Sequence, residues 1–323
     1  MILVKTLDLL ANNPLSQHKG KSMLQIDEWN REELLALLAL ATEIKSMQKS
    51  GKPYQPLIGK TLAMIFTKSS TRTRVSFEVG MYQLGGKSLF LTDKDLQLGR
   101  GETISDTAKI LSSYVDGIMI RTHAHQDVVD LAEYGSIPVI NGLTDLYHPC
   151  QALADLLTIQ EHKGILQGIK LAYIGDGNNV INSLALASAL LGLDIRVATP
   201  PGYEVSKEIA DKVKEYAIES GSQVLFTNDP AEAVTGADVV YTDVWTSMGF
   251  EQENAKRMKD FASYQVNEKL VAMAKLDYLF MHCLPVHREE EVTTGVIDGP
   301  NSVVFEQAEN RLHAQKALLA TVM

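Results

Sequence analysis

The chain is most informative between residues 61 and 84, where it reads Thr61-Leu-Ala-Met-Ile-Phe66, Thr67-Lys-Ser-Ser-Thr-Arg-Thr-Arg74 and Val75-Ser-Phe-Glu-Val-Gly-Met-Tyr-Gln-Leu84. The first six residues are short and almost wholly apolar, which is typical of a strand buried on both faces. The last ten place Phe77, Met81 and Leu84 at helical intervals. The stretch therefore predicts a buried strand, a polar loop and a helix.

Residues 69–74 of the polar loop carry four hydroxyl groups and two guanidinium groups where the helix begins. Free backbone N–H groups and the positive end of the helix dipole attract an anion to that place. Arg72 and Arg74 add forked donors that suit a phosphate. A competing interpretation is that Ser70 or Thr71 only caps the helix, but a cap needs one hydroxyl. The loop therefore predicts a site for a phosphate-like ligand.

The composition limits the classes of protein that this chain can belong to. Its 323 residues are enough for two domains, and a net charge of −10 argues against nucleic acid as a partner. No apolar run has the length of a membrane span. The two cysteines, Cys150 and Cys283, form no C-x-x-C pair, and the N-terminus resembles neither a signal nor a transit peptide. We therefore expect a cytoplasmic protein without a disulfide framework.

Short apolar runs alternate with helical patterns along most of the chain. The predicted strands are 61–66, 87–91, 116–120, 137–140, 170–174, 194–198, 223–227, 238–241 and 278–281. A long helix at 150–163 divides the pattern into two halves, and a last helix covers about 307–320. This alternation predicts an α/β fold of two domains, each a parallel sheet flanked by helices.

Polar clusters follow six of these strands. They are Lys68–Arg74, Arg121–His125, His148–Gln151 (after the loop Asn141–Tyr147), Gly175–Asn179, Asp243–Gly249 and His282–Pro285. Open α/β sheets bind their ligands beyond the carboxyl ends of their strands. The clusters therefore predict an active site in a cleft between the two domains.

The first half supplies cations, namely Arg72, Arg74, Arg121 and, when protonated, His148. Together they surround an anion and present donors to a neighbouring carbonyl oxygen, as in an oxyanion hole. Gln151 is suited to an amide of the same substrate. The competing interpretations are a surface arginine at the end of a strand and a helix N-cap at His148.

The second half offers a carboxylate at Asp243, the amides of Asn178 and Asn179, and a hydroxyl and backbone donors at Ser247 and Met248. This set suits a zwitterion, with the carboxylate facing the ammonium group. The competing interpretation of Asp243 is a helix cap or a turn.

Two other motifs contain residue types that occur in cofactor or catalytic sites. Gly175-Asp-Gly-Asn-Asn-Val180 begins like a dinucleotide fingerprint but has Val180 where the third glycine belongs. Cys283 follows His282, and neighbours on an extended segment point to opposite faces, so they form no ready nucleophilic dyad. The competing interpretation of Cys283 is an inert buried thiol.

Taken together, the motifs resemble those of the aspartate/ornithine carbamoyltransferase family, ornithine type, over nearly the whole chain from about residue 25. The motifs are Ser70–Arg74, His148–Gln151, Asp243–Gly249, His282–Pro285 and Glu309–Arg311. The loop Ser247-Met-Gly249 looks like the ornithine type, whereas the aspartate and putrescine enzymes differ there. The resemblance implies a carbamoyl phosphate-binding domain at 1–150, joined by the helix at about 307–323, and an ornithine-binding domain at 151–306.

The resemblance also implies a set of site residues. Carbamoyl phosphate would be bound by Ser70, Thr71, Arg72, Thr73, Arg74, Gln97 (from an adjacent subunit), Arg121, His148, Gln151, Cys283, Leu284 and Arg311. Ornithine would be bound by Asn179, Asp243, Ser247 and Met248. The catalytic residues would be Arg72, Thr73, Arg121, His148, Asp243 and Cys283.

The implied reaction is attack of the neutral δ-amine of ornithine on the carbamoyl carbon, giving citrulline and phosphate. It needs no metal and no cofactor, and it belongs to arginine biosynthesis or to the arginine deiminase route. The family implies trimers or multiples of trimers. The alternatives are a carbamoyltransferase for another amine such as putrescine, a nicotinamide-dependent dehydrogenase, and a non-catalytic sensor of the same ligands.

Overall fold

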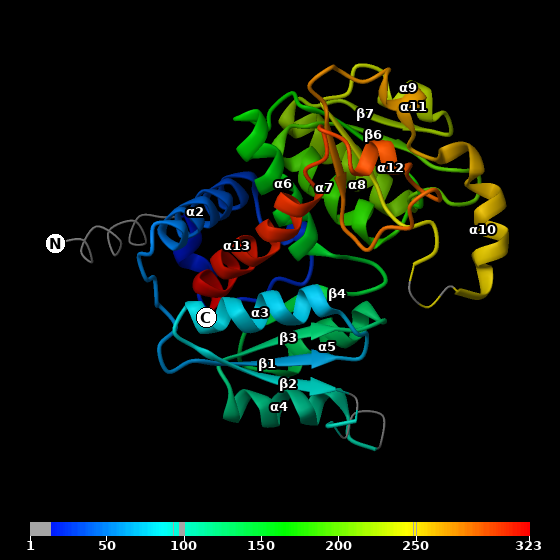
Figure 1. Cartoon of the computed structure of the whole chain (residues 1–323). Helices are drawn as coiled ribbons and strands as arrows, with labels where there is room; N and C mark the ends of the chain where they lie inside the picture. The colour runs from blue at the N-terminus through cyan, green and yellow to red at the C-terminus, as the bar shows by residue number, and fades with distance from the viewer. Residues whose placement is uncertain (1–13, 93, 97–100, 248, 250) are drawn as a thin grey trace. The chain divides into compact units, whose positions relative to one another are not determined.

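A computed structural model of the protein describes residues 14–92, 94–96, 101–247, 249 and 251–323. They form two compact units (Figure 1). The first unit runs to Leu157 and includes Asn310–Met323, and the second unit is Thr158–Glu309. The division between the units falls inside two helices, α6 (Pro149–Lys163) and α13 (Val304–Val322).

The first unit contains a parallel sheet of four strands in the order β2-β1-β3-β4. Its strands are β1 (Thr61–Phe66), β2 (Lys87–Thr92), β3 (Gly117–Arg121) and β4 (Val139–Leu143). The two central strands, β1 and β3, are buried almost throughout, which explains their continuous apolar sequences. Phe66 is paired with Arg121 at the carboxyl ends of these strands. The polar loops that follow the two strands therefore begin at the same edge of the sheet.

Helices cover both faces of this sheet. One face packs against α4 and α5 through a core that includes Ile65, Ile118 and Ala108. Figure 1 shows α3 on the opposite side of the sheet from α4. A Cβ at Gly80 would lie 3.4 Å from Lys316, so α3 and α13 are in close contact there. Among the described residues, the helices that lie wholly within this unit are η1 (Pro14–His18), η2 (Ile26–Glu28), α2 (Arg31–Lys49), α3 (Thr71–Gln83), α4 (Ile104–Tyr114) and α5 (His125–Tyr134).

The second unit contains a parallel sheet of five strands in the order β7-β6-β5-β8-β9. Its strands are β5 (Lys170–Ile174), β6 (Asp194–Ala198), β7 (Val224–Thr227), β8 (Val239–Thr242) and β9 (Leu279–His282). Its helices are α7 (Asn179–Leu191), α8 (Lys207–Ser220), α9 (Pro230–Val234), η3 (Glu251–Glu253), α10 (Asn254–Asp260), η4 (Ala262–Tyr264), α11 (Glu268–Val271) and α12 (Thr294–Ile297). Phe261, Phe280 and Trp245 lie in one buried core with residues of β5 and β8.

The predicted α/β class, with two parallel sheets flanked by helices, is confirmed, and the predicted strands are present close to their expected ends. One expected loop is partly strand: Asn141–Leu143, placed in the loop before Tyr147, belongs to β4. The reason is an irregular pairing in which Arg121 lies opposite Leu143, and the N–H of Thr122 donates to the Leu143 carbonyl at 3.0 Å. Among the described residues, no helix combines the length and the apolarity that a bilayer crossing needs.

Candidate functional site

The N-terminus of α3 is built from the polar loop after β1. Ser70 is its N-cap, with extended backbone angles, and its Oγ accepts a hydrogen bond from the N–H of Thr73 at 3.2 Å. The same hydroxyl donates to Thr73 Oγ1 at 3.1 Å. Thr71 is the first residue of α3 and is exposed. The capping interpretation therefore holds for Ser70, and the assignment of Thr71 and Arg72 to a phosphate-like ligand stays a prediction.

Arg311 of α13 joins this helix terminus to α6. Its Nη2 donates to Thr73 Oγ1 at 3.2 Å, and its Nη1 donates to Gln151 Oε1 at 2.7 Å. The amide nitrogen of Gln151 donates in turn to Asp155 Oδ1 at 2.7 Å. All four side chains are buried. Thr73, Gln151 and Arg311, which come from three motifs far apart in the sequence, are therefore brought together in the first unit.

His148 is buried beside three guanidinium groups. Burial lowers its pKa well below the ordinary value, and the positive charges of Arg311, Arg121 and Arg72 lower the pKa further. The lowered pKa favours the neutral imidazole, whereas His148 was expected to add a positive charge only when protonated. A neutral imidazole still has one N–H donor for a developing oxyanion. The net positive charge of this cluster comes from the three arginines.

Arg74 lies apart from this cluster. It is exposed, its Nε is 3.4 Å from Glu78 Oε2, and its guanidinium carbon is 3.6 Å from the centroid of the Phe90 ring. The guanidinium is therefore held by a carboxylate and an aromatic face of the same unit. Its assignment to carbamoyl phosphate stays a prediction.

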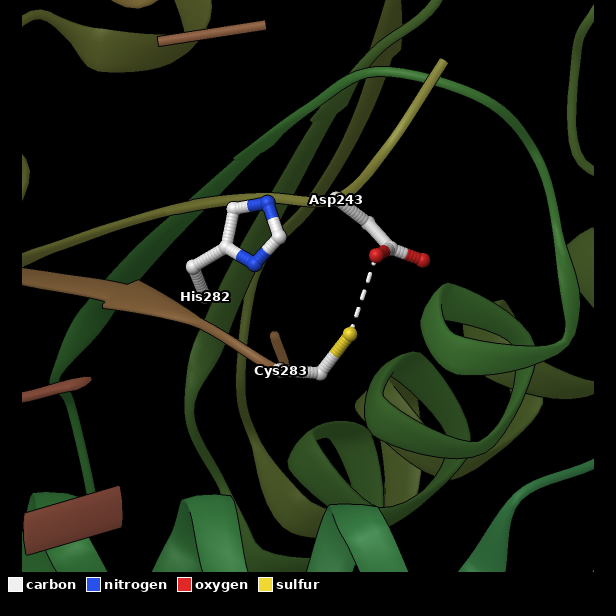
Figure 2. Close-up of side chains that lie close together, drawn as sticks. All are labelled: Asp243, His282 and Cys283. Carbon is white, nitrogen blue, oxygen red and sulfur yellow. Dashed lines mark hydrogen bonds between the residues drawn. The ribbon is translucent and has the colours of Figure 1, made fainter. Parts of the chain in front are cut away.

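In the second unit, the carboxylate of Asp243 is held in one orientation by three neighbours, of which Cys283 is drawn in Figure 2. Oδ2 accepts from Asn178 Nδ2 at 2.8 Å. Oδ1 accepts from the N–H of Val244 at 2.8 Å and from Cys283 Sγ at 2.9 Å. Asp243 is buried and follows β8, so the interpretation as a simple surface turn does not hold. Cys283 is confirmed as a neighbour of Asp243.

His282 and Cys283 point to different partners. The Nδ1 of His282 accepts from the N–H of Leu284 at 2.9 Å, and its Nε2 lies 3.1 Å from Glu291 Oε1. The expectation that His282 and Cys283 form no dyad is therefore confirmed. The ligand atoms of Asp243, His282 and Cys283 lie within 4.8 Å of one another. A metal ion at this cluster would have to break one of the two hydrogen bonds of the imidazole.

The two cysteines differ in character. Cys150 is fully buried, and burial raises the pKa of its thiol to about 12. Its Sγ lies 3.5 Å from the carbonyl oxygen of Asn141. Cys283 is only partly buried. Cys150 is therefore an inert packing residue, whereas the thiol of Cys283 lies within the polar network.

The structure describes some, but not all, of the remaining residues predicted for the two substrates. Asn179 is the first residue of α7 and is half-buried, as is Ser247 in the loop after β8. Met248 lies outside the described residues, and so does Gln97. Leu284 follows Cys283 and has a positive φ of 56°. It therefore occupies a backbone conformation that is uncommon for a residue with a side chain.

The glycines after β5 do not leave room for a dinucleotide. In the dinucleotide fingerprint, the second glycine allows the pyrophosphate to approach the backbone. Here a Cβ at Gly177 would lie 2.5 Å from the backbone carbon of Glu204, so the space beside this glycine is already filled by the protein itself. The motif therefore serves close packing in the second unit.

Sequence reasoning overlooked two residues that organise the second unit, Arg257 and Glu291. It named Asn178 only as an amide donor, whereas Asn178 both caps α7 and holds Asp243. Arg257 donates through Nη1 to Asp176 Oδ2 at 2.7 Å and to the Trp245 carbonyl at 2.9 Å. Glu291 contacts His282. The contact of Arg257 with Asp176 joins residues far apart in the sequence, and the contact of Glu291 with His282 depends on the turn of the chain after β9, so no sequence motif marked either one.

A polar pocket elsewhere in the first unit contains none of the predicted site residues. It is lined by Gln17, His18, Lys21, Ser22, Leu24, Glu28, Trp29 and Glu33. Both carboxylate oxygens of Glu33 are already engaged, by Gln17 and His18 and by the N–H of Asn30. This pocket therefore adds nothing to the chemistry of the site.

Comparison with known proteins covers almost the whole chain. Residues 21–161 match the model "Aspartate/ornithine carbamoyltransferase, carbamoyl-P binding domain", and residues 167–322 match "Aspartate/ornithine carbamoyltransferase, Asp/Orn binding domain". The chain is 61% identical to the ornithine carbamoyltransferase of Anoxybacillus flavithermus over 95% of this chain and 98% of that protein. It is 62% identical to that of Bacillus subtilis over 94% of each. The ornithine carbamoyltransferase structure from Pyrococcus furiosus superposes with a TM-score of 0.92 at 57% identity, covering 94% of this chain and 97% of that one.

Proposed function

The chain belongs to the aspartate/ornithine carbamoyltransferase family, and from this premise we propose how it performs carbamoyl transfer. It transfers the carbamoyl group of carbamoyl phosphate to the δ-amino group of L-ornithine, giving L-citrulline and phosphate. The observation that carries this function is the identity of about 60% over nearly the full length of ornithine carbamoyltransferases. We further propose a role in arginine biosynthesis.

The first unit is proposed to bind carbamoyl phosphate. The N-terminus of α3 carries the positive end of the helix dipole, which attracts a phosphate, and the guanidinium of Arg72 adds a charged donor. The net positive charge of Arg72, Arg121 and Arg311 around the neutral His148 supports a doubly negative ligand there. The residues proposed for this substrate are Ser70, Thr71, Arg72, Thr73, Arg74, Gln97, Arg121, His148, Gln151, Cys283, Leu284 and Arg311.

The second unit is proposed to bind ornithine through Asn179, Asp243, Ser247 and Met248. The fixed carboxylate of Asp243 suits the α-ammonium group, because a carboxylate that is already oriented lowers the ordering cost of binding. Ser247 supplies a hydroxyl to the same substrate. The thiol of Cys283, which donates to Asp243, is proposed to orient the attacking nitrogen.

In the proposed reaction, the neutral δ-nitrogen attacks the carbamoyl carbon and a C–N bond forms. Negative charge develops on the carbonyl oxygen and is stabilised by Thr73, Arg121 and the N–H of the neutral His148. The C–O bond to phosphate then breaks, and the proton of the amine passes to the departing phosphate or to water. Correct placement of two reactants contributes several kcal/mol, about 7 to 11 in favourable model reactions.

We propose domains at residues 1–150 with about 307–323 for carbamoyl phosphate and at 151–306 for ornithine. We also propose a homotrimer in the cytoplasm. A trimer is supported by an apolar stripe on α3, formed by Val75, Val79 and Tyr82, whose exposed fractions are 50, 36 and 79%. An apolar stripe of this kind on one helix face marks a protein contact surface. A reducing compartment is supported by the thiols of Cys150 and Cys283, which are not joined in a disulfide.

The function is tested by incubating the protein with carbamoyl phosphate and a panel of amines. We expect citrulline and a matching amount of phosphate with L-ornithine, and little product with putrescine or L-aspartate. Phosphate release with putrescine but not with ornithine would identify a different carbamoyltransferase. Binding of carbamoyl phosphate without release of phosphate in any mixture would identify a non-catalytic sensor.

A further inference from the structure

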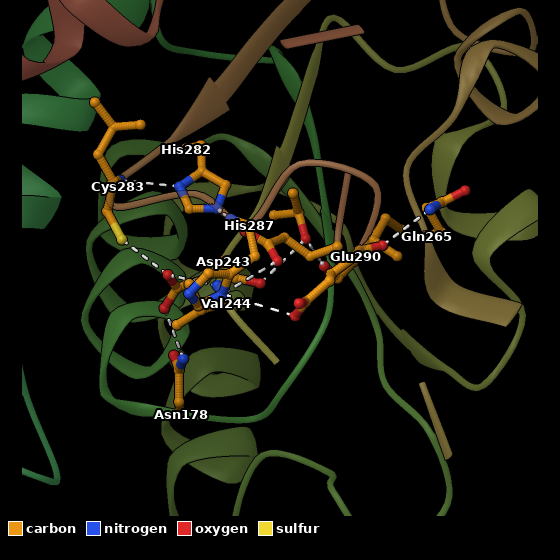
Figure 3. A network of polar contacts seen from close by, with 12 residues as sticks. Asn178, Asp243, Val244, Gln265, His282, Cys283, His287 and Glu290 are labelled. Carbon is orange, nitrogen blue, oxygen red and sulfur yellow. Dashed lines mark hydrogen bonds and ion pairs between the residues drawn. The ribbon is translucent and has the colours of Figure 1, made fainter. Parts of the chain in front are cut away.

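Glu291 is a fully buried carboxylate beside the Asp243–Cys283 network, and the reaction described above does not use it. It lies in the segment that follows β9. Its Oε1 accepts a hydrogen bond from the N–H of His287 at 2.7 Å and lies 3.1 Å from Nε2 of His282. Both histidines are labelled in the polar network of Figure 3. A buried carboxylate is costly unless its environment satisfies it. The burial of the Glu291 carboxylate therefore needs a physical explanation.

The contacts of His282 with Leu284 and Glu291 determine the tautomer of its imidazole. The N–H of Leu284 donates to Nδ1 of His282 at 2.9 Å, so Nδ1 must carry a lone pair. In the neutral ring, the proton then belongs to Nε2, which faces Oε1 of Glu291. The carboxylate accepts this proton's hydrogen bond and fixes the ring orientation, as outer partners of functional histidines commonly do.

The fixed imidazole in turn holds the next two residues of the chain. Leu284 has a φ of 56°, which costs free energy for a residue with a side chain and persists only where neighbours hold it. The hydrogen bond from its N–H to His282 is such a restraint. Cys283 lies between these two residues, and its Sγ meets Asp243 Oδ1 at 2.9 Å.

We propose that Glu291 is a positioning residue that sets Cys283 and Leu284 through His282. Removal of its acceptor frees the imidazole to rotate, releases the N–H of Leu284 and withdraws the thiol from Asp243. The inferred effect on turnover rests on the proposed function of Asp243 and Cys283. The inferred effect on the thiol does not, and it is measured without any substrate.

The variants are Glu291→Leu, which has a similar size but no acceptor, and Glu291→Gln, which keeps an acceptor oxygen. The matched controls are Glu290→Leu and Glu290→Gln. Glu290 is the neighbouring carboxylate, is half-buried and lies 3.8 Å from Nδ1 of His287. It therefore tests the loss of a carboxylate from the same loop at a position that faces His287 rather than His282.

The first readout is the alkylation rate of Cys283 by iodoacetamide, followed by mass spectrometry of the whole protein. The chain has only one other cysteine, Cys150, which is fully buried with a pKa raised to about 12. Label on Cys150 therefore reports global unfolding, and label on Cys283 alone reports a local change. We expect Glu291→Leu to speed labelling of Cys283 several-fold with Cys150 unlabelled, and Glu291→Gln and both Glu290 variants to match the parent protein.

The second readout is steady-state kinetics. We expect Glu291→Leu to lower kcat/KM for ornithine on the order of tenfold, as loss of an outer partner typically does, and Glu291→Gln to recover most of it. An unchanged Cys283 labelling rate in a folded Glu291→Leu protein would overturn the proposal. If no amine in the panel were carbamoylated, the proposed function would fail while the labelling result still decided the role of Glu291.

If Glu291→Leu also exposes Cys150 to iodoacetamide, the experiment is repeated with Glu291→Asp in its place. This variant keeps the charge but withdraws the carboxylate by one methylene from His282. We expect faster labelling of Cys283 than in the parent protein with Cys150 protected. A parent-like labelling rate for Glu291→Asp would contradict the role assigned to Glu291.

Discussion

At the scale of single residues, Arg311 connects two of the side chains proposed for the carbamoyl phosphate site in the first unit. Its two terminal nitrogens donate to Thr73 and Gln151 at 3.2 and 2.7 Å. We predict that Arg311→Lys raises the KM for carbamoyl phosphate by roughly tenfold or more, because a lysine cannot reproduce the fork and a hydrogen bond to a charged group contributes about 1.5 to 3 kcal/mol. Steady-state kinetics and thermal melting measure the effect on binding and on stability.

The control for this substitution is Arg288→Lys. Arg288 also makes a forked contact, to Asp298 at 3.0 and 2.7 Å, but on the exposed surface of the second unit. We expect the control to keep the parental KM. Equal KM values for carbamoyl phosphate in Arg311→Lys and Arg288→Lys would show that Arg311 is only a structural link.

The lowered pKa of His148 leads to a prediction about how stability depends on pH. Its folded pKa is lowered by burial and by Arg311, Arg121 and Arg72, whereas in the unfolded chain it titrates near 6.5. Above pH 6.5 both states are neutral and His148 has no effect on stability. Below pH 6.5, the unfolded chain binds a proton at His148 and the folded protein does not. The free energy of unfolding therefore falls by up to about 1.4 kcal/mol per pH unit.

His148→Gln removes this proton uptake. The free energies of unfolding by urea at pH 7.5 and 5.5 measure the effect, each compared between the two proteins. We expect the difference to move in favour of the variant at pH 5.5, by about 1.4 kcal/mol for one unit below the unfolded pKa. A difference that does not change with pH would mean that His148 is charged in the folded protein.

At the scale of elements, the start of α7 combines a helix cap with the orientation of a site residue. The Oδ1 of Asn178 accepts from the N–H groups of Val180 and Ile181, and its Nδ2 donates to Asp243. We predict that Asn178→Ser keeps the cap but loses the second contact, so the KM for ornithine rises while stability stays near the parental value. Asn178→Ala should lose both and cost about 1 kcal/mol of stability. Equal stability of the Ser and Ala variants would refute the capping role.

Whole elements were more predictable than the contacts between them. The strand Thr61–Phe66 and the helix after it follow from local apolar spacing, which a single sequence displays directly. The extension of β4 to Leu143 was missed because it depends on pairing with Arg121 of another strand. Local pattern fixes what an element is, and tertiary pairing decides where it ends.

At the scale of the whole molecule, the two parallel sheets were predictable from the alternation of strands and helices, and the chemical character of each unit from its polar loops. The protonation of His148 was not, because burial and neighbouring charges set it and neither is written in local sequence. Arg257 and Glu291 were missed for the same reason. Their partners, Asp176 and His282, are known only once the chain is folded.

The assembly makes the last prediction. The α3 stripe of Val75, Val79 and Tyr82 lies on one face of the helix, and we propose that it is covered by another copy of the chain. A charge placed there would have to be buried without a partner, so the double variant Val79→Lys and Tyr82→Lys should dissociate the trimer. Light scattering should give about three times the 35.5 kDa chain mass for the parent protein and the single-chain mass for the variant. Ile218→Lys on α8, where the isoleucine is 83% exposed, is the matched control and should remain assembled. A parent protein with the mass of one chain would refute the trimer, and an assembled double variant would place its contact surface elsewhere.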